Sequence, residues 1–185
     1  YPDAEVLSRD TGHTRSYGRN PYVGYERSDE PFLYDGPILG EDYDPFERVV
    51  TIEHNGEVAA APYSVLRRRG ALPITVGGTD FVVLWAAGTA GALDTARIAE
   101  GRDVGSANAF FAETADGHRV VFGTSESTGD GNGPDDGEFP PAVSRDGTEW
   151  NIAGEAIAGP REGAHLRRAP AIQHFRFSHD AFAGR

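Results

Sequence analysis

Short apolar segments separated by two-residue turns recur along the chain from about residue 49 onward. The four turns are Asn55-Gly56, Gly77-Gly78, Asp116-Gly117 and Asp146-Gly147. The segments that flank them are Val49–Ile52 with Val58–Ala60, Leu72–Val76 with Phe81–Trp85, Ala109–Thr114 with Val120–Phe122, and Val143 with Trp150–Ile152. Because asparagine, aspartate and glycine tolerate the positive φ angles of tight turns, this pattern predicts four β-hairpins.

The run Phe81–Trp85 is apolar throughout. A strand without alternation is typical of burial on both faces, so we expect this segment to be the central strand, with Trp85 and Trp150 in the core. Helix signals are weak, since only Ala90–Ile98 and Ser178–Phe182 have suitable residues and both are short. The predicted fold is mainly β: an antiparallel barrel or sandwich built of hairpins, with one or two short helices.

The first 47 residues differ from the remainder of the chain. They are rich in Tyr, Pro, Gly and Asp and have little periodicity, which is typical of an extended segment. We therefore expect an N-terminal arm over residues 1–47, packed on a single β-rich domain over residues 48–185. Residues 123–141 form a Gly-, Asp-, Ser- and Pro-rich stretch inside that domain, and long stretches of this kind are usually functional or disordered loops.

The charge is strongly unbalanced: 29 acidic residues oppose 17 basic ones, and the net charge is −12. All basic residues are arginine. Such a surface suits molar salt, where counter-ions screen the self-repulsion, so we expect a salt-adapted organism; a high-GC mesophile is the alternative. The charge argues against nucleic acid as a partner, because a duplex requires a basic stripe. The dense basic run Arg67–Arg69 is interpreted as a solvated strand end or an ion-pair cluster.

Cysteine is absent, which excludes disulfides and thiolate metal sites. No stretch approaches the ~18 apolar residues of a membrane-spanning helix. Methionine is also absent and the chain begins Tyr1-Pro2-Asp3. We expect a processed product or a fragment, with any export signal or anchor upstream of Tyr1.

Several ordered segments resemble one known family. They are Glu53–Leu66, Val76–Gly78, Gly88–Asp94, Gly101–Ala107, Thr148–Pro160 and His174–Phe177. Together they make the chain similar, from about Tyr1 to Phe182, to the family of domains of unknown function numbered 3179. The resemblance implies an exported or lipid-anchored protein of bacteria or haloarchaea with no agreed activity.

This sequence departs from the family at one place. Many members carry a Cys-Pro-Leu-Cys-like segment after the strand equivalent to Phe81–Leu84, whereas this chain has Trp85–Thr89. Any redox or metal chemistry of those cysteines is therefore not expected here. Tyr1–Ser8 resembles the segment that closes a family unit, which implies that this chain is the later unit of a longer protein.

An acidic stretch is the first candidate for a metal site. Its oxygen-bearing side chains are Asp130, Asn132, Asp135, Asp136 and Glu138. Carboxylate and amide oxygens on a glycine-rich backbone suit Ca²⁺, although the spacing is not that of an EF-hand. The alternative is a hydrated acidic loop without a bound ion.

A second candidate for a metal site lies near the C-terminus, where His174, His179 and Asp180 are types of residue that bind zinc or copper. On a continuous strand, however, His174 and His179 would point to opposite faces. The sequence therefore favours surface and cap histidines over a metal site.

Aromatic residues of the arm are candidates for an interaction surface, in particular Tyr17, Tyr22, Tyr25 and Tyr34. Amphipathic rings favour interfaces with a sugar or another subunit. The alternative is that the rings fasten the arm to its own sheet, since an irregular segment needs large anchors to offset its ordering entropy.

No catalytic pattern accompanies these candidates. Ser64, Ser106 and Ser125 lack the Gly-x-Ser-x-Gly signature, so no catalytic residue or cofactor other than Ca²⁺ is assigned. We expect a non-catalytic structural or interaction module, extracellular or on the cell surface, whose partner is the preceding unit of the same precursor or further copies of itself. The alternatives are a calcium- or carbohydrate-binding module and an enzyme of unknown reaction with a site shared with a missing unit.

Overall fold

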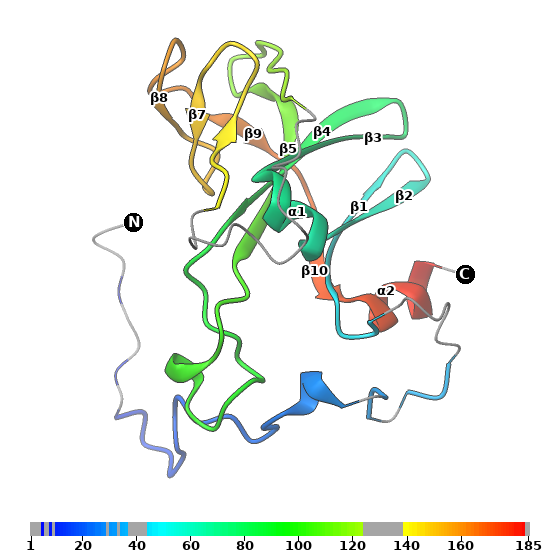
Figure 1. Ribbon diagram of the computed structural model, residues 1–185, viewed down its shortest axis with the longest axis vertical. Coiled ribbons are helices and arrows are strands. Elements are labelled where there is room, and N and C mark those ends of the chain that lie inside the picture. The colour runs from blue at the N-terminus through cyan, green and yellow to red at the C-terminus, as the bar shows by residue number, and fades with distance from the viewer. Residues whose placement is uncertain are drawn as a thin grey trace.

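The computed structural model describes residues 5, 8, 10–28, 30–32, 34–36, 44–123 and 139–183. Their elements follow in chain order (Figure 1): η1 (Tyr25–Arg27), β1 (Arg48–His54), β2 (Glu57–Pro62), α1 (Tyr63–Arg69), β3 (Ala71–Val76), β4 (Thr79–Ala86), η2 (Ile98–Glu100), β5 (Ser106–Thr114), β6 (Ala142–Val143), β7 (Glu149–Trp150), β8 (Ala156–Ala158), β9 (Leu166–Arg168), β10 (Ile172–Phe175) and α2 (Arg176–Ala183). All strand pairs are antiparallel, and the fold is mainly β as predicted.

Two tight hairpins open the β-rich part. In the β1–β2 turn, Asn55 and Gly56 have φ angles of 50° and 78°. In the β3–β4 turn, Gly77 and Gly78 have φ angles of 53° and 73°. Two consecutive residues with positive φ match the right-handed twist of the flanking strands, so both hairpins form as predicted.

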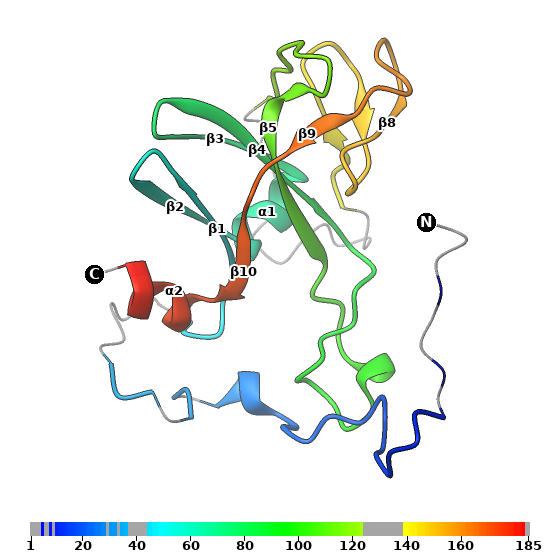
Figure 2. The ribbon, with the colours of Figure 1, turned by 180° about the vertical axis from the view of Figure 1, so that it is seen from behind.

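The strands form three sheets, with the orders β10-β1-β2, β3-β4-β5-β9 and β6-β7-β8. The second sheet is central, and the other two cover its opposite faces (Figures 1 and 2). Phe81, Val83 and Trp85 of β4 pack in the core shared with the first sheet. Val82 and Leu84 pack in the core shared with the third. β4 is thus buried on both faces, as its apolar run predicted, and the described sheets stack in layers without closing into a barrel.

The other two predicted hairpins differ in outcome. β6 and β7 pair across the Asp146-Gly147 turn, with Ala142 opposite Trp150. The chain also reverses after β5, where the N–H of Val120 donates to the carbonyl of Ala112 (2.9 Å). Residues 120–122 nevertheless form no strand beside β5, and an isolated bridge joins Glu113 to Arg119. The Val120 and Phe122 side chains instead enter the core beneath the third sheet.

Helix α1 was not predicted, and the interpretation of Arg67–Arg69 as a strand end was wrong. These arginines form the last turn of α1, where cations interact favourably with the helix dipole. Tyr63 and Leu66, three residues apart, bury the same face of the helix. Gly70, with a φ angle of 67°, ends it by donating its N–H to the carbonyl of Leu66 (2.8 Å). Seven residues were too few to show helical periodicity.

The helix expected over Ala90–Ile98 was also wrong. This segment is irregular up to η2, because its backbone bonds to the arm instead of to itself. The helical turn expected over Ser178–Phe182 lies within α2, as predicted. No helix in the described ranges is both long enough and apolar enough to cross a membrane.

Candidate functional site

The N-terminal arm lies against the loop that joins β4 to β5 (Figure 1). The N–H of Asn20 donates to the carbonyl of Ala96 (3.0 Å), and that of Gly24 donates to Leu93 (3.2 Å). In the reverse direction, the N–H of Ile98 donates to Gly18 (3.1 Å). Two irregular segments therefore satisfy each other's backbone groups, as the strands of a sheet do.

Two buried carboxylates fix this contact. The side chain of Glu26 is fully buried, and its Oε2 accepts a bond from Arg48 Nη2 (2.8 Å) and lies 3.3 Å from Arg102 Nη2. Asp94, also buried, accepts bonds from the guanidinium of Arg27 and from the backbone N–H of Arg102 (2.7 Å). Buried charges persist only when they are paired and hydrogen-bonded, so these five residues act together as an ionic clamp.

The electrostatics of the loop follow from these bonds. The N–H of Arg102, followed by the Arg27 side chain, holds the pKa of Asp94 below its usual value. Burial opposes ionisation of Asp103, but the N–H groups of Gly88, Gly105 and Thr89 outweigh it and lower that pKa as well. Both carboxylates stay ionised at neutral pH and stabilise the loop between β4 and β5, against which the arm lies.

The four candidate tyrosines divide into two pairs. Tyr25 packs edge-on against Phe46, with ring centroids 5.1 Å apart, and Tyr34 packs against Phe177 at 5.3 Å. Tyr17 and Tyr22 are instead 54% and 63% exposed. Tyr25 and Tyr34 therefore anchor the arm, whereas Tyr17 and Tyr22 present their rings to the solvent.

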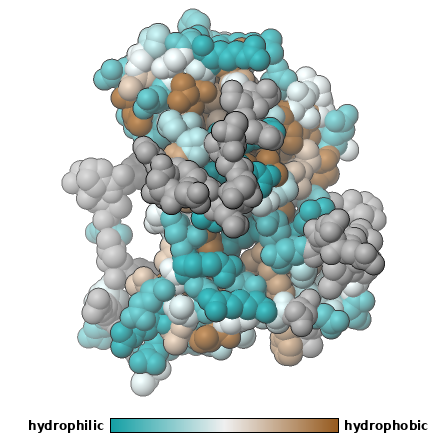
Figure 3. Space-filling view, viewed as in Figure 1, coloured by the Kyte–Doolittle hydropathy of each residue, from teal (hydrophilic) through white to brown (hydrophobic). Residues whose placement is uncertain are grey.

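Further apolar side chains are exposed on the same arm: Val23 is 57% and Phe32 is 72% exposed. We call the side chains of Tyr17, Tyr22, Val23 and Phe32 the arm surface. Figure 3 shows hydrophobic residues among hydrophilic ones along the lower edge of the molecule, where the arm runs in Figure 1. The backbone N–H of Tyr22 donates to Asn20 Oδ1 (2.7 Å), and this bond fixes the backbone conformation at Tyr22.

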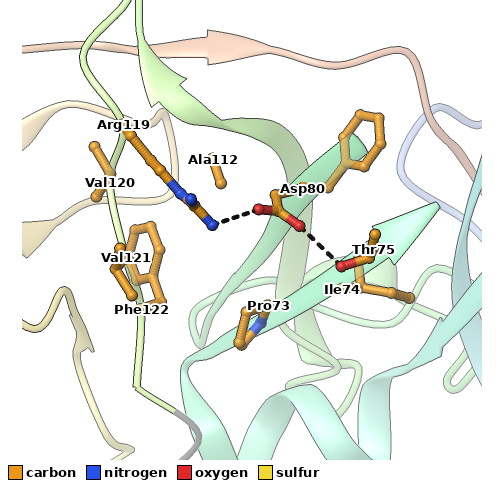
Figure 4. Close-up of a pocket in the computed structure, with 10 residues that line it drawn as sticks. Pro73, Ile74, Thr75, Asp80, Ala112, Arg119, Val120, Val121 and Phe122 are labelled. Carbon is orange, nitrogen blue, oxygen red and sulfur yellow. Dashed lines mark hydrogen bonds and ion pairs between the residues drawn. The ribbon is translucent and has the colours of Figure 1, made fainter. Parts of the chain in front are cut away.

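A separate groove of about 240 Å³ lies on the central sheet at the β3 edge (Figure 4). Pro73, Val120 and Phe122 supply apolar walls. Asp80 lies at its polar end, where it accepts bonds from Arg119 Nη2 (2.7 Å) and from Thr75 Oγ1 (2.9 Å). The charged groups of this groove already satisfy one another.

The remaining sequence candidates fall in several places. Asp130, Asn132, Asp135, Asp136 and Glu138 lie outside the described residues, as does Ser125, so calcium binding stays a prediction. Ser106 pairs with the hydroxyl of Thr89, and the N–H of Ser64 donates to Glu47 Oε1 (2.7 Å). Across the ranges that the structure covers, no three histidine or carboxylate side chains gather as metal ligands would.

His174 and His179 do come together, which corrects the expectation that they point apart. That expectation assumed a continuous strand, but β10 ends at Phe175 and α2 begins at the next residue. Both rings bond to the hydroxyl of Thr51. Burial, together with the neighbouring His179, lowers the pKa of His174.

The ionic clamp was missed from the sequence. Glu26 and Asp94 are 68 positions apart and look like ordinary members of an acidic composition. No local spacing pattern marks them, because the clamp depends on how the arm meets the loop.

Comparison with known proteins identifies a family. The sequence model of the family described as "Protein of unknown function (DUF3179)" matches residues 1–185, the whole chain. No curated protein and no solved structure matches significantly. The match confirms the family resemblance of the ordered segments, and the chain therefore belongs to the DUF3179 family.

Proposed function

We propose that this chain is a non-catalytic interaction module, acting outside the cell or on its surface, and that the arm surface binds a protein. The observation that carries the proposal is the combination of exposed apolar side chains with a firmly held backbone. Tyr22 and Val23 are exposed only a few residues from Glu26, which is buried in the ionic clamp. A segment that is already ordered loses little conformational entropy on binding.

The chemistry of the arm supports a protein partner. Tyrosine and arginine are enriched where proteins meet, because a ring or guanidinium provides both apolar contact and hydrogen bonds. The arm surface has this mixture: Tyr17 and Tyr22 lie close in sequence to Arg15, Arg19 and Arg27.

Charge favours a second copy of this chain as the partner. Residues 10–28 carry three arginines against two carboxylates; Glu26 is buried and Arg27 is paired with Asp94, which leaves Arg15 and Arg19 against Asp10. The complete chain has a net charge of −12. Residues 1–47 as a whole carry eleven carboxylates against four arginines, but the segment around Tyr17 and Tyr22 is locally basic and complements the acidic surface of another copy. A head-to-tail contact of this kind builds rings or filaments. The extracellular location rests on the family resemblance.

Sedimentation velocity of the full chain over a concentration series, in moderate and in molar salt, tests this proposal. We expect concentration-dependent assembly that Tyr22→Ser weakens at least tenfold. Ile157→Ser is the matched control, because Ile157 in β8 is similarly exposed, at 53%, and lies outside the arm. A chain that stays monomeric throughout, or that Ile157→Ser weakens equally, would overturn self-association.

A further inference from the structure

The C-terminal helix brings two histidines from different elements to one point. β10 pairs with β1, with His174 opposite Val49 and Ile172 opposite Thr51. The chain then enters α2 at the lower end of β10, beside β1 (Figure 2). His179 occupies the first turn of α2 and reaches back to the buried Thr51. The strand–helix junction, rather than a loop, sets the position of both rings.

The ring nitrogens of the two histidines converge on a single oxygen atom. His174 Nε2 lies 2.7 Å from Thr51 Oγ1, and His179 Nδ1 lies 3.0 Å from the same atom. The rings are nearly perpendicular, at 84°, and their centroids are 5.8 Å apart. A hydroxyl has one proton, so one imidazole accepts from Thr51 while the other donates to it. When the donating ring changes to its other tautomer, the lone pairs of both ring nitrogens face the same small volume.

We propose that His174 and His179 form a binding site for a late first-row transition-metal ion of the zinc and copper class. Neutral imidazole is the side chain that such ions prefer, and Zn–N bonds of about 2.0–2.1 Å require nitrogens that face a common point. Among the described residues no third histidine, cysteine or carboxylate joins the pair. The ion therefore keeps water on its remaining positions.

The alternative is a purely structural hydrogen-bond pair that fastens α2. The chain contains a natural comparison for that alternative, because His54 Nε2 bonds to Thr79 Oγ1 (3.0 Å) with no second imidazole at that hydroxyl. A histidine–threonine bond alone needs one ring. The second ring at Thr51 is what distinguishes the C-terminal pair.

Metal binding at this place has a consequence for the arm. The first turn of α2 also carries Phe177, which packs against the anchor Tyr34 and against Phe46. An ion that joins α2 to β1 holds Phe177 in place and so stabilises these aromatic contacts. The metal site does not depend on the proposed interaction function.

The test uses the full chain, stripped with chelator and titrated with Zn²⁺ or Cu²⁺. We expect one ion per chain by calorimetry and a rise in melting temperature of roughly 5–10 °C at a hundredfold excess over the dissociation constant. His174→Gln and His179→Gln should each weaken binding at least tenfold, whereas His54→Gln should bind like the unaltered chain.

A second measurement needs no variant, so misfolding of a variant cannot affect its result. Electron paramagnetic resonance of Cu²⁺ on the unaltered chain should show coupling to two imidazole nitrogens, without any substitution. Unchanged binding by both C-terminal variants, or a Cu²⁺ spectrum without imidazole nitrogen, would overturn the site.

Discussion

The two faces of β4 and the underside of the N-terminal arm are both buried, but different interactions stabilise them. Around β4 the buried side chains are apolar, including Phe81, Val82 and Leu84. Beneath the arm they include Glu26 and Asp94 with their arginine partners. Apolar burial is non-directional and insensitive to pH, whereas a buried ion pair fails when one partner is lost. The core defines the fold, and the clamp positions the arm on it.

The largest effect is expected in the apolar core. Phe81→Ala removes a fully buried ring from β4, and should lower the free energy of unfolding by about 3–5 kcal/mol because it leaves a cavity. Chemical denaturation followed by circular dichroism measures this loss. Val121→Ala, at an exposed position, is the control. If both substitutions lower the free energy of unfolding by the same amount, β4 is not the centre of the core.

Breaking the ionic clamp should have a smaller and more local effect. Glu26→Gln removes the charge that pairs with Arg48 and Arg102, and should destabilise the arm by about 2–4 kcal/mol. Hydrogen–deuterium exchange followed by mass spectrometry should show lost protection at Asn20 and Gly24, with β4 unchanged. Equal loss of protection in β4 would show that the arm and the core are one cooperative unit.

Acid should weaken the same region to a lesser extent. The folded pKa of Asp94 is depressed, so its contribution is complete above the unfolded value of about 3.9 and is lost as the pH falls through the folded value. Amide NMR spectra should therefore show the arm resonances changing below about pH 4, before those of β4. Asp94→Asn should flatten this response, and an unaltered pH profile would contradict the assignment.

The smallest effects on stability should separate the two pairs of tyrosines. Tyr25→Ala removes a ring packed on Phe46 and should cost about 1–2 kcal/mol. Tyr22→Ala removes an exposed ring and should change the free energy of unfolding by less than about 0.5 kcal/mol. Thermal melts of both variants provide the comparison. A large loss of stability in Tyr22→Ala would show that Tyr22 also anchors the arm.

The core could be predicted from the sequence because its signals are local. The turns Asn55-Gly56 and Gly77-Gly78 identify their hairpins, and the apolar run of β4 identifies a strand buried on both faces. The failures arose where tertiary contacts override local preference. Ala90–Ile98 has good helix formers, yet it gives its hydrogen bonds to the arm.

The candidate sites depend still more on contacts that are distant in sequence. Tyr22 and Tyr25 are three positions apart, and only the docked arm shows which of them is exposed. The histidine pair escaped prediction because the strand ends at Phe175 and the helix begins directly at Arg176. Spacing along a strand then no longer describes where His179 lies.

Site-specific photo-crosslinking from the position of Tyr22 tests the central claim most directly. A benzophenone group placed there in the full chain should form adducts with a second copy of the chain, identified by mass spectrometry. The same group at the position of Ile157 should form none. Adducts from position 157 alone, or no intermolecular adduct from position 22 at any protein concentration, would contradict the account of the arm as an interaction surface.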